Sequence, residues 1–129
     1  MVLETSAAIA IVQREPSFEV LQNQMERASL LLMSAVSYME ASVVLHNRGN
    51  RTGLSAFERL LSYSQTEIVE VDLLQAQLAR DAHARFGKGR GHPAKLNLAD
   101  CFAYALAIYR RHPLLFVGND FIHTDVLRA

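Results

Sequence analysis

The side chains best suited to chemistry in this sequence are four carboxylates that stand far apart along the chain. They are Glu4, Glu40, Asp100 and Asp120. If folding gathers them, each like-charged pair about 4 Å apart costs about 4 kcal/mol at an effective dielectric constant of roughly 20. Such a cluster takes up protons or binds hard cations, and Mg²⁺ and Mn²⁺ suit sites made only of oxygen ligands. One or two such ions position a water as a nucleophile and stabilise charge on a phosphodiester.

Two of these acids follow segments that we predict to be strands. Glu4 comes directly after the apolar run Met1–Leu3, and Asp120 comes three residues after the run Leu114–Val117. In a parallel sheet, ligand sites lie beyond the carboxyl ends of the strands, so we expect both acids at that edge. The alternatives are an ordinary polar residue at a strand end for Glu4 and turn chemistry for Asp120.

Asp100 lies at the predicted start of a long helix. It is the third residue after Asn97, a residue type that often caps helices. In the first turn of a helix, free backbone N–H groups favour a negative charge. Asp100 is therefore either a partner of Asn97 in helix capping or a member of the acidic site.

Glu40 lies in the helix predicted after the second strand. Val36, Met39, Val43 and Val44 recur there at helical spacing, and Glu40 falls within the face that they form. We expect this face to point toward the core. A buried carboxylate without an obvious Lys or Arg nearby costs several kcal/mol, which a bound cation would offset.

Strand-like and helix-like segments alternate along the chain. The predicted strands are Met1–Leu3, Leu30–Met33, Glu67–Val71 and Leu114–Val117. Helices are predicted after Glu4-Thr5-Ser6, after Pro16, from a cap at Ser34 or Ser37 to about His46, over Leu54–Ser62, from Asp72 to Phe86, and over Leu98–Arg111. The alternation predicts an α/β fold in which a short parallel sheet of four or five strands is flanked by helices.

Composition and length are typical of one soluble domain. The chain has 129 residues, of which half are hydrophobic and a fifth are charged, so we expect a single domain over residues 1–129. The only cysteine, Cys101, cannot form a disulfide within the chain. The sequence begins without a basic leader and has no apolar run long enough to cross a membrane, which predicts a cytoplasmic location and no membrane partner.

The formal net charge is zero, but one stretch is basic. The cations between residues 80 and 111 are Arg80, Arg85, Lys88, Arg90, Lys95, Arg110 and Arg111, against Asp81 and Asp100 alone. Such a stripe attracts phosphates, although a solvated surface of mixed charge is the simpler interpretation. Lys88 and Arg90, in the glycine-rich loop Gly87–Lys95, are the preferred candidates for contacting phosphates.

At the four acids the sequence resembles the PIN-domain family, and within it the ribonuclease toxins of the VapC type. Residues 1–7 (Met-Val-Leu-Glu-Thr-Ser-Ala) are similar to the family's opening strand, and residues 37–41 (Ser-Tyr-Met-Glu-Ala) to the helix that carries its glutamate. The most specific match is residues 96–105 (Leu-Asn-Leu-Ala-Asp-Cys-Phe-Ala-Tyr-Ala). Residues 116–121, followed by Thr124-Asp125, resemble the fourth acidic motif.

The resemblance implies a metal-dependent endoribonuclease that is the toxin of a type II toxin–antitoxin system and cleaves structured RNA of the tRNA or rRNA class. Glu4 and Asp100 would be the most direct ligands of Mg²⁺ or Mn²⁺, and Glu40 and Asp120 would complete the pocket or orient water. The hydroxyl of Thr5 or Ser6 would support the metal or the substrate. The resemblance further implies a homodimer and a VapB-type antitoxin as partner.

The sequence departs from the family pattern at Glu4, where the family has aspartate. The extra methylene moves the carboxylate by about 1.5 Å, roughly one C–C bond. Because Mg²⁺ demands nearly ideal octahedral geometry, we expect reduced activity or an altered metal preference. The alternative is a non-catalytic PIN fold that binds its antitoxin or RNA without cleaving. A receiver-type phosphoacceptor domain is disfavoured, because the first strand offers one acid where such a site needs paired acids.

Overall fold

The computed structural model describes residues 1–47 and 51–129 and confirms the α/β fold with its short parallel sheet. Within these residues four strands form one sheet in the order β3-β2-β1-β4, with every pair parallel. The strands are β1 (Val2–Leu3), β2 (Leu32–Ser34), β3 (Glu67–Val69) and β4 (Leu114–Leu115). Each lies within the predicted segment or overlaps it closely, and each is shorter than predicted at its carboxyl end or its start.

Six helices connect and flank these strands in the described parts of the chain. They are α1 (Thr5–Val12), α2 (Phe18–Glu26), α3 (Ala35–Asn47), α4 (Arg51–Tyr63), α5 (Leu73–Phe86) and α6 (Leu98–Arg110). Asp72 caps α5 as predicted, because its side chain accepts a hydrogen bond from the backbone N–H of Gln75. Ser34, and not Ser37, caps α3: its Oγ accepts from the N–H of Val36 at 3.3 Å.

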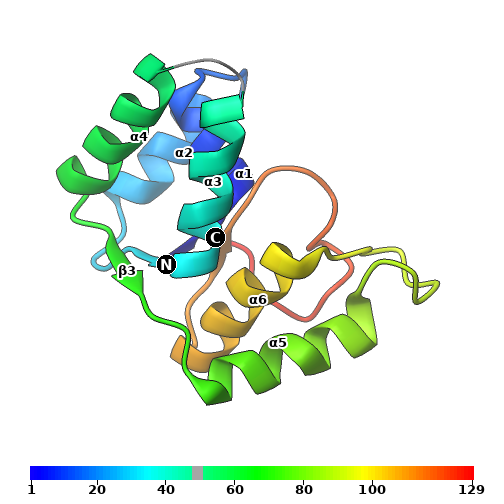
Figure 1. Cartoon of the computed structure of the whole chain (residues 1–129). Coiled ribbons are helices and arrows are strands. Elements are labelled where there is room, and N and C mark those ends of the chain that lie inside the picture. The colour runs from blue at the N-terminus through cyan, green and yellow to red at the C-terminus, as the bar shows by residue number, and fades with distance from the viewer. Residues whose placement is uncertain (48–50) are drawn as a thin grey trace.

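The sheet separates two hydrophobic cores because successive side chains of a strand point to opposite faces. On one face, Val2, Leu32 and Leu114 pack with α5 and α6. On the other, Leu3, Met33 and Leu115 pack with the first four helices. Figure 1 shows these two groups of helices, with α1 to α4 above and to the left of α5 and α6.

The prediction of which face of α3 packs against the core is wrong. The residues that α3 buries are Ser37, Ala41 and Leu45, whereas Met39 is 60% exposed and Val43 is 40% exposed. Small side chains at Ser37 and Ala41 let α3 approach α1 and α6, which both contact it. A helix with apolar residues on several faces does not reveal which face is buried, because shape then matters as much as hydrophobicity.

The order of the strands creates a topological switch between β1 and β4. The chain builds outward from β1 through β2 to β3 and then returns through α6 to place β4 on the free side of β1. In open parallel sheets the crevice beyond the carboxyl ends at such a point is where ligands bind. None of the described helices is long and apolar enough to span a membrane.

Candidate active site

Glu4 is fixed where β1 passes into α1. It is the N-cap of α1, and its Oε2 accepts hydrogen bonds from the backbone N–H of Ser6 at 2.8 Å and from the Ser6 hydroxyl. The same hydroxyl oxygen accepts from the N–H of Val117 at 2.9 Å, just beyond β4. Ser6 therefore holds the Glu4 carboxylate between the ends of the two strands that flank the topological switch.

Asp100 both caps its helix and faces the acidic cluster, so the two interpretations of the sequence are compatible. The N–H of Asn97 donates to Asp100 Oδ2 at 2.7 Å, and the N–H of Asp100 donates to Asn97 Oδ1 at 2.9 Å. This reciprocal capping box fixes the carboxylate at the start of α6. Within the described residues Oδ1 of Asp100, like Oε1 of Glu4, accepts no hydrogen bond and remains available to a ligand.

The charges of the four acids, predicted separately from the sequence, influence one another: Glu4 and Asp100 each interact with Glu40, and Asp120 interacts with Asp100. Burial raises the pKa of Glu4 to about 7; the hydrogen bonds from Ser6 lower it, and the charges of Asp100 and Glu40 raise it further. Burial also raises the pKa of Asp100 to about 6; its hydrogen bond from Asn97 lowers it, and Glu40 and Asp120 raise it. Each acid thus interacts with at least one other member of the cluster.

The four acids differ in exposure, from buried to exposed. Glu4 is 3% exposed and Asp100 is 6% exposed, Glu40 is half-buried, and Asp120 is exposed. Glu40 therefore does not point into the core as the sequence suggested, because the buried face of α3 lies elsewhere. The ion pairs found in the described ranges leave all four acids without a cationic partner.

Sequence inspection missed the position of Ser37, one turn before Glu40 on α3. Its backbone carbonyl accepts a hydrogen bond from Thr5 Oγ1 at 3.3 Å, so it lies against the residue that follows Glu4. Its own hydroxyl is fully buried and finds no hydrogen-bond partner among residues 1–47 and 51–129. A buried hydroxyl of this kind calls for a water or a ligand beside it.

The donor set fits a partly hydrated hard cation. Within the described residues no three His, Cys, Asp or Glu side chains are arranged to enclose a metal ion. Mg²⁺ does not need such an enclosure, since it keeps several waters and is commonly held by one or two carboxylates. Glu4 and Asp100 would supply those carboxylates, since each has one oxygen that accepts no hydrogen bond from the described residues.

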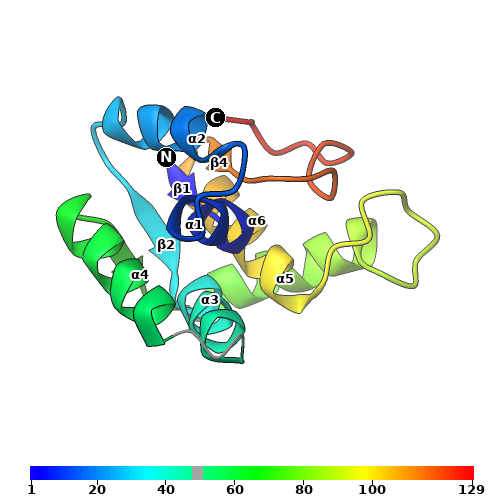
Figure 2. The ribbon, with the colours of Figure 1, turned by 90° about the horizontal axis from the view of Figure 1, so that it is seen from above.

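The two predicted phosphate contacts, Lys88 and Arg90, are exposed in the loop between α5 and α6. This loop projects away from the sheet (Figure 2). Its base is closed by the N–H of Lys88, which donates to the carbonyl of Leu96 at 2.9 Å. Arg90 lines a hollow of about 390 Å³ together with Leu98 and Phe102 of α6, so it reaches the start of the helix that carries Asp100.

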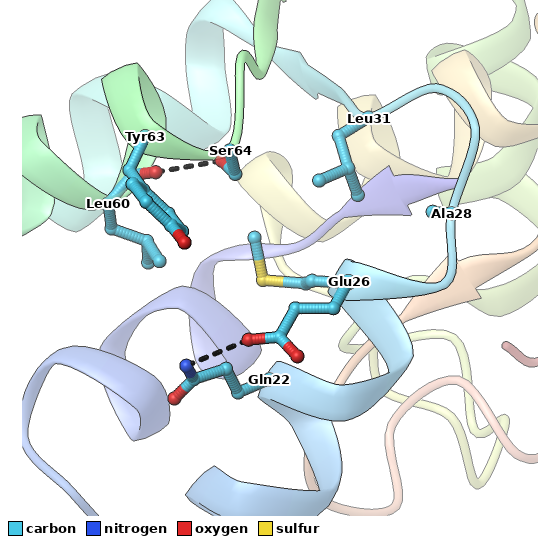
Figure 3. A pocket seen from close by; sticks show the side chains of 8 residues that line it. Gln22, Glu26, Ala28, Leu31, Leu60, Tyr63 and Ser64 are labelled. Atoms are coloured by element: carbon cyan, nitrogen blue, oxygen red, sulfur yellow. Dashed lines mark hydrogen bonds between the residues drawn. The ribbon is translucent and has the colours of Figure 1, made fainter.

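A separate hollow of about 270 Å³ lies near the starts of β2 and β3, at the opposite edge of the sheet from Glu4. Figure 3 shows Leu31, Leu60 and Tyr63 around it. Its one carboxylate, Glu26, accepts a hydrogen bond from Gln22 at 3.1 Å. This hollow has a lining of mixed polarity and lacks the clustered acids of the site at the other edge.

Residues 1–127 match the PIN domain family. The chain belongs to this family. It is 43% identical over 129 residues to the VapC ribonuclease Mb0625 of Mycobacterium bovis, covering 100% of this chain and 97% of that protein. It is 40% identical to ribonuclease VapC42 of Mycobacterium tuberculosis, covering 100% of this chain and 98% of that protein. These relatives place it among the VapC proteins.

Solved structures show the same fold. The sarcin–ricin loop cleaving toxin VapC20 of Mycobacterium tuberculosis superposes with a TM-score of 0.77 at 14% identity, covering 99% of this chain and 97% of the other. A toxin–antitoxin complex from Klebsiella pneumoniae contains a chain that superposes with a TM-score of 0.73 at 16% identity, covering 99% of this chain and 95% of the other.

The raised pKa of Glu4 predicts a characteristic pH dependence of stability. In the folded, metal-free protein Glu4 holds its proton up to about pH 7, whereas the unfolded chain releases it near 4.5. The folded state thus binds more protons, and this contribution to stability is lost as pH rises through that window. We expect the Glu4→Gln variant not to lose stability in this window. At pH 8 its free energy of unfolding should exceed that of the parent by about 3 kcal/mol.

Urea unfolding in EDTA at pH 5, 6, 7 and 8 measures this difference between the two proteins. Glu70→Gln, at an exposed glutamate between β3 and α5, is the matched control and should show a constant difference across the series. A constant difference for Glu4→Gln as well would contradict the raised pKa.

Proposed function

We propose that this protein is the endoribonuclease toxin of a toxin–antitoxin pair and that it uses Mg²⁺ or Mn²⁺ at the Glu4–Asp100 edge. The observation that carries the proposal is the interaction of four carboxylates beyond the switch between β1 and β4. Ribonuclease names among relatives that match the full length of the chain support it.

A bound divalent ion would supply a nucleophilic water at neutral pH and stabilise charge on the phosphodiester. Glu4 and Asp100 hold the ion, because each keeps one oxygen available while the other is fixed by N–H donors. Glu40 and Asp120, at the open side of the cluster, orient water and the substrate. Burial of the first two acids strengthens their attraction for a cation over that of exposed carboxylates.

RNA with a folded structure, of the tRNA or rRNA class, is the proposed substrate. The naming of VapC20 as a toxin that cleaves the sarcin–ricin loop supports this class. Lys88 and Arg90 would contact its phosphates from the α5–α6 loop, which is exposed and rich in glycine.

A VapB-type antitoxin and a second copy of the chain are the proposed protein partners, in the cytoplasm. The toxin–antitoxin complex among the structural neighbours supports the first partner. The exposed apolar side chains of α3, Met39 and Val43, support the second, since exposed apolar groups near one another are common in interfaces.

A non-catalytic module that binds RNA or antitoxin is the second candidate. The observation in its favour is that Ser6 occupies one oxygen of Glu4 with two donors and ties this longer side chain toward β4. In this case the acidic edge would bind without cleaving.

Cleavage should depend on Asp100. Asparagine at this position keeps an oxygen to accept the N–H of Asn97, so the capping of α6 survives while the charge is lost. We expect Asp100→Asn to reduce cleavage of an end-labelled pool of structured RNAs by at least about 100-fold, in the range found when key electrostatic groups are removed.

Assays in Mg²⁺, Mn²⁺ and EDTA test the metal in parallel. Asp81→Asn, at an exposed aspartate of α5, should cleave like the parent. Cleavage that persists in EDTA, or in Asp100→Asn, would refute the proposed site.

Glu4→Asp should increase cleavage. The shorter side chain withdraws the carboxylate by about 1.5 Å and restores the spacing of the family pattern. We expect a gain on the order of 10-fold in turnover, because metal-bound groups respond strongly to small displacements. Glu70→Asp is the matched control. If Glu4→Asp lowers the rate or leaves it unchanged while Asp100→Asn abolishes it, the attenuation hypothesis is wrong; if no variant cleaves, the binding module is favoured.

Lys88 and Arg90 should contribute to RNA affinity through phosphates. In the Asp100→Asn background, which prevents cleavage, we expect Lys88→Ala and Arg90→Ala each to weaken binding and to reduce the slope of log K against log salt by about 1. Arg59→Ala, at an exposed arginine of α4, is the control. Titrations over a range of salt concentrations measure the slopes, and unchanged slopes would exclude these two contacts.

A further inference from the structure

The loop after β4 carries Asp120 and is fastened at several points. Asp120 is followed by Phe121, whose buried ring packs against Phe116 with 5.1 Å between centroids. The hydroxyl of Thr124 donates to the carbonyl of Phe121 at 2.8 Å and closes a turn. The Phe121 ring also belongs to the core formed with α5 and α6, so the loop is anchored there by apolar packing.

Asp125 adds directed hydrogen bonds that join this loop to α5 and α6. Its Oδ1 accepts a hydrogen bond from the Tyr104 hydroxyl at 2.5 Å, and its Oδ2 accepts one from Arg85 Nη2 at 2.7 Å. Arg85 also donates to the Tyr104 oxygen at 3.5 Å and lies 4.4 Å from the centre of the Phe86 ring. The Phe86 ring in turn meets the Tyr104 ring edge to face at 5.7 Å.

The helical position of Tyr104 relates these contacts to the acidic site. Tyr104 comes four residues after Asp100 in α6, so both side chains lie on the same face of the helix. A loop held at Tyr104 therefore runs along the face that presents Asp100.

We propose that Arg85, Tyr104 and Asp125 form a tether that positions Asp120 beside Asp100. The three are positioning residues, since they act through the loop, and their effect on cleavage rests on the proposed function. The proposal also separates Arg85 from the basic stripe: its guanidinium is committed to Asp125 and Phe86, whereas Lys88 and Arg90 remain the candidates for RNA.

The tether acts on geometry more than on global stability. Arg85 and Asp125 have side chains that are more than half exposed, and ion pairs in such surroundings contribute little to the free energy of unfolding. A loop that ends in two directed bonds nevertheless loses much of its freedom. Substitutions in the tether should therefore loosen residues 118–124 locally while the fold remains intact.

Two conservative variants test the tether. Tyr104→Phe removes one hydroxyl and keeps the ring against Phe86, and Asp125→Asn removes the charge that Arg85 meets. We expect both to accelerate hydrogen exchange of residues 118–124 by about 10-fold or more, with no change in the helices. In the RNA assay we expect kcat to fall by about 10-fold and KM to stay within about twofold, as for lost supporting contacts at other active sites.

Gln77→Ala is the control, because Gln77 is an exposed residue of the same helix and takes no part in the tether. It should change neither readout. Exchanging the partners, with Arg85→Asp and Asp125→Arg together, should recover part of the protection that either substitution alone removes.

Unchanged exchange in both Tyr104→Phe and Asp125→Asn would overturn the tether, whatever the activity. A loosened loop with an unchanged kcat would overturn its positioning role. If the parent protein does not cleave RNA under any condition, the proposed function fails and the positioning role with it, while the exchange data still decide whether the tether exists.

Discussion

Burial of carboxylates beside one another is the constraint around which this structure is built, and the starts of two helices reduce its cost. Glu4 caps α1 and Asp100 occupies the first turn of α6, so each meets backbone N–H groups and the positive end of a helix dipole. These donors offset the burial and the repulsion only in part, because the pKa values remain raised to about 7 and about 6. The negative charge of these carboxylates is therefore only partly compensated by the folded chain.

The parallel sheet determines where helices begin relative to one another. Its strands are two or three residues long, yet their common direction places the beginnings of α1 and α3 at one edge. Ser6 joins the ends of β1 and β4 across the topological switch, through Glu4 on one side and Val117 on the other. The small buried face of α3 then lets this helix, and Glu40 with it, approach the same edge.

Among the side chains that the structure describes, no cation forms an ion pair with the four acids. Arg85 pairs with Asp125, while Lys88 and Arg90 stand on an exposed loop beyond the start of α6. An internal salt bridge would have satisfied the acids and removed their attraction for a metal ion. A negative cluster with positive charge at some distance suits a substrate that brings phosphates and needs a cation between them and the protein.

The sequence by itself determined the α/β class, the four strands and the caps at Asp72 and Asn97, and it supplied the four acids as candidates, because these depend on local patterns and on motifs a few residues long. Only the tertiary structure decided that α3 buries Ser37, Ala41 and Leu45, that Asp100 serves in capping and in the cluster at once, and that Tyr104 meets Asp125. These outcomes depend on contacts between segments far apart in the chain, where shape and the competition for buried space select one arrangement. Hydrophobic periodicity cannot predict these contacts, because it indicates which residues favour burial and not which residues they pack against.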